Sequence, residues 1–116
     1  MVNVQDARLD TVFRALGDVT RRRMLRTLAQ GECTVGQLAE PFRMSLAAAS
    51  KHVKSLECAG LIRREIRGRV HICRLEAEPL CAASEWLRFY EQFWNVRLDR
   101  LEDLLRQDAK LKRKPR

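Results

Sequence analysis

Apolar residues in the first quarter of the chain recur every three or four positions, which is the spacing of an amphipathic helix. They predict one helix over residues 9–16 and a second over residues 21–30. Gly17 separates the two segments, and either Asp18 or Thr20 is a suitable N-cap for the second helix. The chain is therefore expected to begin with a pair of helices.

Two further helices are predicted from their capping residues. Thr34, with Gln37 three positions later, forms a capping-box pattern that starts a third helix, and Pro41 should distort the last turn of that helix. Ser45 is the next N-cap and Gly60 is a typical residue after a helix C-terminus, so a fourth helix should lie between them. A helical wheel gives this fourth helix an apolar face and an opposite face that is small, polar and cationic, with Ala47, Ser50, Lys51 and Lys54.

In the second half of the chain, apolar and polar side chains first alternate, and the apolar residues then return to helical spacing. Residues 61–75 alternate apolar and polar side chains on both sides of Gly68, which predicts a β-hairpin with arginines at its tip. One long helix is expected from Pro79 to about Gln107, and it carries five of the seven aromatic residues. Its apolar stripe is longer than the core of one small domain can cover, so we expect a second copy of the chain to cover part of it.

Composition is typical of one small globular domain. The chain has 116 residues, of which 46% are hydrophobic and 33% charged. No apolar run is long enough to cross a bilayer, and the N-terminal residues lack the apolar stretch of a signal peptide, so we expect a cytoplasmic protein with no membrane partner. We expect a single domain over residues 1–108 and a flexible basic tail over residues 109–116.

Basic residues are concentrated in the fourth helix and the hairpin. The net charge is +8, and residues 43–74 hold eight basic side chains against two acidic ones. The predicted fold is mainly α with a small β-hairpin, in the order α-α-α-α-β-β-α. This order is typical of winged helix-turn-helix proteins, whose second motif helix enters the major groove of duplex DNA.

A single copy would cover only a small length of DNA, so we expect a two-fold dimer that reads a palindromic operator as a sequence-specific transcriptional regulator. The residues expected to contact DNA from the helix and the hairpin tip are Ser45, Ala47, Ser50, Lys51, Lys54, Arg67 and Arg69.

The chain resembles the ArsR/SmtB family of bacterial transcriptional regulators over roughly residues 9–75. The matching segments are FRALGDVTRRRMLRTL, ECTVGQLAEPFRMSLAAASKHVKSLECAGLI and RGRVHICRL. Within them the pattern SxxxxSKHxxxLExAGL is specific, because few chance matches are expected. The resemblance implies a homodimer that is joined through the first and last helices and represses its own operon.

The resemblance also implies roles for individual residues. It adds His52 to the DNA-contact candidates, although the wheel places this side chain toward the core and leaves its role open between buttressing the helix, contacting a phosphate and reading a base. The residues implied for the dimer interface are Leu9, Val12, Phe13, Tyr90, Trp94, Leu98, Leu101 and Leu105.

Neither familiar metal-binding pattern of this family is present in the sequence. Many relatives use a Cys-x-Cys pair at the start of the third helix, where this chain has Thr34 and Gly36, with Cys33 one residue out of register. Others use aspartate and histidine on the last helix, which has no histidine here. We therefore expect no metal and no cofactor, and a place in a branch that lacks the usual metal ligands.

The sequence is also compatible with other functions. Cys58 and Cys81 are candidate sensor thiols, so a thiol- or metal-responsive repressor is one alternative, and a winged-helix protein-interaction module is another. An enzyme is not expected, because the sequence shows no histidine paired with a carboxylate motif, no glycine-rich phosphate loop and no metal-ligand cluster. Nothing in the sequence identifies a small-molecule effector.

Overall fold

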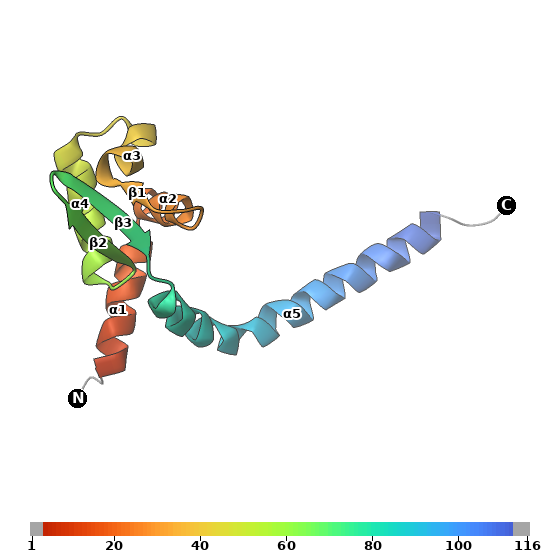
Figure 1. The fold of residues 1–116 in the computed structure, drawn as a ribbon. Coiled ribbons are helices and arrows are strands. Elements are labelled where there is room, and N and C mark those ends of the chain that lie inside the picture. Colours follow the sequence, from red (N-terminus) through yellow and green to blue (C-terminus); the bar gives the residue numbers. More distant parts are fainter. Residues whose placement is uncertain (1–3, 113–116) are drawn as a thin grey trace. The chain divides into compact units, whose positions relative to one another are not determined.

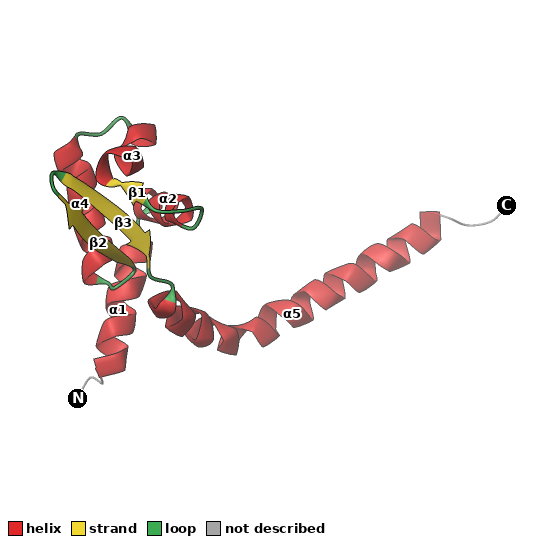
Figure 2. Cartoon of the chain, in the orientation of Figure 1, coloured by secondary structure: helices red, strands yellow, loops and turns green. Residues whose placement is uncertain are grey.

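The computed structural model describes residues 4–112 as a set of helices with a small sheet (Figures 1 and 2). In chain order the elements are α1 (Val4–Leu16), α2 (Val19–Leu28), β1 (Cys33–Thr34), α3 (Val35–Ala39), the 3₁₀ helix η1 (Glu40–Phe42), α4 (Leu46–Cys58), β2 (Ile62–Arg67), β3 (Val70–Leu75) and α5 (Glu78–Lys112). The chain divides into two compact units, residues 1–83 and residues 84–116.

The core of the first unit lies between its helices and one face of its sheet. The largest fully buried side chains come from α2, α3, α4, β3 and the residue just before β2, and they are Met24, Leu38, Val53, Leu56, Leu61 and Cys73. The first turns of α5 close the same core through Ala83, which is 3% exposed. Removing these apolar side chains from water is the main force that holds the unit together.

The predicted hairpin is present, but it belongs to a three-stranded antiparallel sheet of order β1-β3-β2. The additional strand, β1, pairs Cys33 with Cys73 on β3. Two residues are too few for any alternation to be visible, so this strand could not be predicted from the sequence. Gly68 begins the two-residue loop between β2 and β3 with φ 64°, a conformation that glycine adopts without strain.

Capping residues define the helix ends as expected. Of the two candidates, Asp18 caps α2, accepting a hydrogen bond from the backbone N–H of Arg21. Thr34 and Gln37 form the complete capping box of α3. The distortion expected at Pro41 is confirmed, because α3 ends at Ala39 and the chain continues as η1.

The C-terminus of α4 is a Schellman motif that aims the chain into the sheet. Gly60 adopts φ 73° at the C′ position, and its N–H donates to the carbonyl of Glu57 at 3.0 Å. The N–H of Leu61 donates to the carbonyl of Leu56, also at 3.0 Å. These two bonds satisfy carbonyls at the helix end and place Leu61 in the core before β2 begins.

Both outer helices are longer than expected. α1 begins at Val4 rather than residue 9, and α5 continues to Lys112, so residues 109–112 of the expected tail are helical. Ala109, Lys110 and Leu111 are strong helix formers, which explains the extension. The last four residues of that expected tail, 113–116, lie outside the described residues. Within residues 4–112, no helix is long and apolar enough to cross a membrane.

Candidate nucleic-acid interface

The fold holds α4 with one face in the core and the opposite face exposed. Ala49, Val53 and Leu56 have no measurable exposure and fix the helix in the core. The outward side chains of Ala47, Lys51 and Lys54 are exposed, as the helical wheel predicted. α4 therefore presents a surface of one small residue and two cations that the core does not need.

The N-terminal end of α4 is well ordered by its cap. Ser45 accepts a hydrogen bond from the N–H of Ala48 at 3.1 Å through its side-chain oxygen. Arg43, in the turn before it, adopts the left-handed conformation with φ 48°, which is uncommon for a residue other than glycine. Ser50, also a DNA-contact candidate, is half-buried and lines a pocket with residues of the strands, so its predicted place on the outer face with Lys51 and Lys54 was wrong.

His52 connects α4 to α2 through the residue that caps α2. Its Nδ1 lies 3.7 Å from a carboxylate oxygen of Asp18, and the His52 side chain is 25% exposed. The same Asp18 oxygen accepts the N-cap hydrogen bond from Arg21 at 3.0 Å. This bond, with the nearby charges of Arg21 and His52, holds the pKa of Asp18 below its usual value. This position of His52 suits a role in buttressing the helix, and its contact with DNA stays a prediction.

The tip of the hairpin, residues 65–70, is called the wing below. It carries both expected arginines, which differ in their contacts. Arg67 donates two hydrogen bonds to Glu65 at 3.1 and 3.2 Å, and its hydrogen bond is the main reason that the pKa of Glu65 lies below its usual value. Arg69 is exposed and makes no hydrogen bond or ion pair with any described residue. An exposed ion pair contributes little stability, so Arg67 can exchange Glu65 for another anion at small cost.

The residues expected at a dimer interface fall into three groups. Val12 is 2% exposed and packs in the core of its own chain, so it offers no surface to a partner, contrary to expectation. Helical spacing alone could not separate it from its neighbours, because Leu9 and Phe13 lie on the same side of α1 and are only half-buried. The α5 residues are 39–60% exposed, and they are Tyr90, Trp94, Leu98, Leu101 and Leu105.

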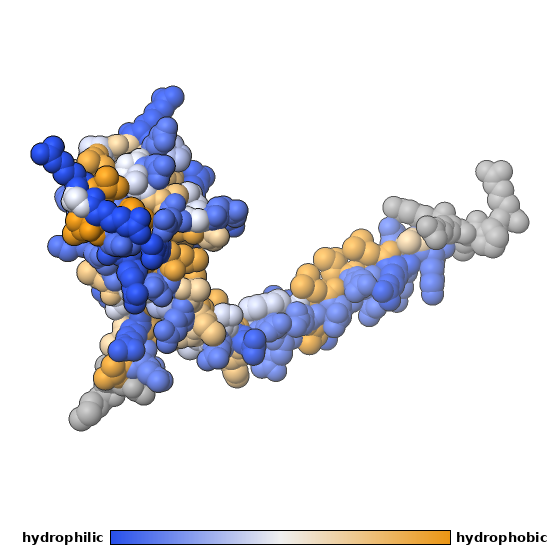
Figure 3. Space-filling view, in the orientation of Figure 1, coloured by the Kyte–Doolittle hydropathy of each residue, from blue (hydrophilic) through white to orange (hydrophobic). Residues whose placement is uncertain are grey.

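The far part of α5 exposes apolar side chains along most of its length. Figure 3 shows hydrophobic side chains gathered along one side of this helix. Near its start the rings of Trp86 and Tyr90 lie 5.0 Å apart, as do those of Phe89 and Tyr90. These contacts within one helix still leave Phe89 63% exposed and Trp94 44% exposed. A continuous apolar surface of this size is typical of a protein–protein contact.

The cysteines divide by exposure. The two candidate sensor thiols, Cys58 and Cys81, are free and exposed. Cys73 is buried in the sheet, and its burial raises the pKa of its thiol. Within the part of the chain that the structure describes, no group of three or more histidine, cysteine or acidic side chains is arranged to hold a metal ion.

Comparison with known proteins places this geometry in a family. The sequence model of a protein family, the helix-turn-helix domain, matches residues 16–65 of this chain. The transcriptional repressor SdpR of Bacillus subtilis (strain 168) is 32% identical over 79 residues, which cover 68% of this chain and 88% of SdpR.

Solved structures match a larger part of this chain than the SdpR sequence does. A crystal structure of an ArsR family transcriptional regulator has a TM-score of 0.73 and 40% sequence identity, covering 82% of this chain and 97% of that one. The solution structure of a homodimeric winged helix-turn-helix DNA-binding domain from Mycobacterium bovis has a TM-score of 0.53 and 28% sequence identity. The match covers 85% of this chain and 83% of that one. The expected winged helix-turn-helix fold is thereby confirmed, and this chain belongs to the ArsR family of DNA-binding transcriptional regulators.

Proposed function

We propose that this protein is a cytoplasmic, dimeric repressor that reads a palindromic operator with α4 and the wing. The observation that carries the proposal is the exposure of Ala47, Lys51 and Lys54 on a helix whose opposite face is fixed in the core. Cations held on a rigid helix keep a constant position relative to a DNA groove, so their contacts can fix the register of the protein on the duplex.

The proposed contacts divide the work between the two elements. Ser45 and Ala47 lie at the start of α4, where small side chains allow the backbone to come close to base edges. Lys51 and Lys54 bind phosphates or base acceptors farther along the helix, and Ser50 contributes from its inner edge. On the wing, Arg69 contacts the backbone or the minor groove, and Arg67 joins it after leaving Glu65.

We further propose that two copies associate through the apolar surface of α5 together with Leu9 and Phe13 of α1. The exposed aromatic and leucine side chains of α5 supply the apolar area that such an interface requires. The homodimeric state of the similar domain from Mycobacterium bovis supports the association of two copies. A two-fold dimer would present two copies of α4 to half-sites about one helical turn apart.

The double substitution Lys51→Ala/Lys54→Ala tests the role of α4. The DNA is an operator duplex selected with the unchanged protein from a random-sequence pool, and its affinity is measured by fluorescence anisotropy over a range of salt concentrations. We expect weaker binding and a plot of log K against log salt that is flatter by about one to two units, because each lost phosphate contact releases about one counterion fewer.

Arg97→Ala/Arg100→Ala is the matched control, since it removes two exposed positive charges from α5 at the same cost in net charge. This control should keep the salt dependence within about half a unit of the unchanged protein. Equal effects of the two double substitutions would contradict the assignment of α4 as the DNA-reading helix, because only net charge would then matter.

A further inference from the structure

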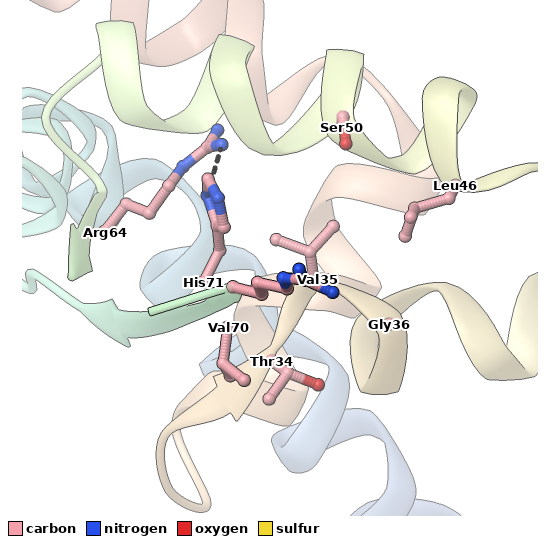
Figure 4. A pocket seen from close by; sticks show the side chains of 9 residues that line it. Thr34, Val35, Gly36, Leu46, Ser50, Arg64, Val70 and His71 are labelled. Carbon is pink, nitrogen blue, oxygen red and sulfur yellow. Dashed lines mark hydrogen bonds between the residues drawn. The ribbon is translucent and has the colours of Figure 1, made fainter. Parts of the chain in front are cut away.

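A cavity of about 470 Å³ lies between the helix-turn-helix and the strands of the first unit. Its walls come from the start of α3, from the inner edge of α4 and from β2 and β3, as Figure 4 shows. The volume falls within the range of about 300–1,000 Å³ that small-molecule sites occupy. The function proposed above uses two residues of its lining, Ser50 and Arg69, but assigns no ligand to the space between them.

One side of the cavity is apolar. Val35 of α3, Leu46 of α4 and Val70 of β3 line it, and Leu46 and Val70 are 61% and 45% exposed in the structure. Apolar side chains of this size at a concave site favour a ligand that brings apolar surface of its own.

The other side of the cavity is polar and positively charged. Arg64 and His71 extend from neighbouring strands, with Arg64 Nη1 3.4 Å from His71 Nδ1, and Ser50 faces them from α4 (Figure 4). Arg69 adds a second positive charge to the lining, and none of the lining residues is acidic. The cavity therefore combines apolar walls with a cationic end.

The guanidinium of Arg64 does not use all of its hydrogen-bond donors. Its Nε is buried and has no hydrogen-bond partner among the described residues. The carboxylate of Glu57 lies 3.5 Å from this atom, close enough for an ion pair but without the alignment of a hydrogen bond. The Arg64 side chain is only 18% exposed, so water cannot fully replace the missing partner. Buried cations with unmet hydrogen-bonding capacity are costly. Because Nε has almost no accessible surface, an anion in the cavity would reach the guanidinium through its terminal nitrogens and lower that cost by pairing with the charge.

We propose that this cavity binds a small amphipathic carboxylate, with the carboxylate paired to Arg64 and the apolar body against Val35, Leu46 and Val70. Arginine suits this role because its planar group can donate two hydrogen bonds to one carboxylate. His71 stands close enough to Arg64 to add a hydrogen bond to the same group, and Ser50 offers a hydroxyl elsewhere in the lining of the cavity.

Occupation of the cavity would also affect DNA binding, a step that depends on the function proposed above. The ligand touches α4 and the wing at once, and these are the two elements proposed to hold the duplex. A ligand that fits the DNA-free arrangement better than the DNA-bound one lowers DNA affinity, and DNA lowers ligand affinity by the same factor. The bound carboxylate would then release the repressor from its operator.

Sodium decanoate, used below its micelle concentration, is the probe for the binding step, and decanol is the uncharged control of equal chain length. Two-dimensional ¹H–¹⁵N spectra of the full chain are recorded during the titration. We expect the amide signals of Ser50, Arg64 and His71 to shift with decanoate, and decanol to bind at least about tenfold more weakly, since a charge-assisted pair is lost. Shifts confined to α5, or equal binding of the two compounds, would overturn the proposal.

Two substitutions locate the site. Arg64→Gln should weaken decanoate binding about tenfold, whereas the matched control Arg63→Gln should leave it unchanged, because Arg63 lies on the opposite face of β2, is 75% exposed and pairs with Glu76. Val70→Trp fills the cavity from β3 and should abolish binding, which keeps the test valid if Arg64→Gln does not fold. Undiminished binding by Val70→Trp, or equal loss in the two arginine variants, would refute the assignment.

Coupling to DNA is measured separately with the selected operator duplex. Decanoate should weaken duplex binding at least about fivefold in the unchanged protein and have no effect in Val70→Trp. If decanoate binds in the cavity without altering DNA affinity, the coupling is wrong although the site is real. The Lys51→Ala/Lys54→Ala result is independent of either outcome, so failure of the DNA-binding proposal is distinguishable from failure of the ligand site.

Discussion

Asp18 links a local interaction, the N-cap of α2, to the position of α4. It caps α2 through the N–H of Arg21 and lies 3.7 Å from His52 on α4. One carboxylate thus satisfies a free helix N–H and steadies the helix proposed to read DNA. The cap alone is identifiable from sequence, whereas the contact with His52 depends on how α2 and α4 cross in the folded chain.

Replacement of Asp18 separates these two contributions. We expect Asp18→Ala to reduce the free energy of unfolding by about 1 kcal/mol, a typical cost for a lost N-cap. Asp18→Asn keeps a capping oxygen and should cost less, although it removes the charge beside His52. Urea unfolding, monitored by circular dichroism at one fixed protein concentration, gives both values. Equal losses in the two variants would mean that the charge, rather than the cap, is what matters.

The depressed pKa of Asp18 gives this effect a pH dependence. Because the folded state favours the ionised carboxylate, the stabilisation is complete at pH values above the ordinary aspartate pKa. It is lost as the pH falls through the lower pKa of the folded state. The difference in unfolding free energy between the unchanged protein and Asp18→Ala should therefore shrink between neutral pH and about pH 3. A constant difference over this range would contradict the cited shift.

The cysteines make a second prediction at the scale of single residues. Cys58 and Cys81 are exposed, whereas Cys73 is buried and its thiol pKa is raised, so Cys73 is both inaccessible and poor in reactive thiolate. Brief treatment of the native protein with iodoacetamide should alkylate the first two and spare Cys73, which should react only after unfolding. Peptide mass spectrometry reads out each site. Early alkylation of Cys73 would show that the sheet opens readily.

Among the elements, the junction between α4 and β2 depends most strictly on one backbone conformation. Gly60 has φ 73°, and an added Cβ would lie 3.5 Å from the Cγ of Pro79, which is an ordinary contact. The cost of a side chain here is therefore conformational rather than steric crowding. The Schellman motif that this glycine allows is what brings Leu61 into the core.

Gly60→Ala should reduce the unfolding free energy by about 1 kcal/mol, because an alanine is strained in the left-handed region. Gly36→Ala is a matched control inside α3, where the φ is not left-handed and the nearest contact of a new Cβ would be Thr34 Oγ1 at 3.8 Å. That control should be neutral or stabilising by up to about 1 kcal/mol, because alanine favours helices. Thermal unfolding at one fixed concentration compares the two, and destabilisation of equal size would refute the conformational explanation.

At the scale of the whole molecule, the main feature is the apolar surface of α5, which a single copy of the chain leaves exposed. Leu98 and Leu101 are 57% and 52% exposed, and both lie on the stripe shared by Tyr90, Trp94 and Leu105. We expect Leu98→Glu/Leu101→Glu to give monomers, because burying two carboxylates in an apolar interface is unfavourable. Those monomers should bind the operator duplex weakly, since they can occupy only one half-site at a time.

Sedimentation velocity provides the measurement of mass. Asn95→Glu/Gln107→Glu is the control, which adds the same charge to α5 at positions off the stripe. The control should remain dimeric. A stable dimer in the leucine variant would contradict the proposed interface, and monomers in both variants would indicate a nonspecific effect of charge.

Local chemistry explains what the sequence alone determined about this protein. Helical spacing, the Thr34–Gln37 capping box, Ser45, Gly60 and the alternation about Gly68 each act within a few residues. They therefore predicted the element order, the outward cations of α4 and the wing before any packing was known. The family resemblance depended on the same local residues, and it too was confirmed.

The tertiary structure decided what depends on distant segments meeting. Pairing across the sheet created β1 opposite β3, core packing buried Val12 between half-buried neighbours, and the crossing of α2 and α4 brought Asp18 to His52. The cavity beside Arg64 arises in the same way, from β1, α3, α4 and the hairpin, which are far apart in the sequence. Periodicity gives the face of a helix that turns inward but not the partner it meets there, because that partner is fixed by packing of the whole core.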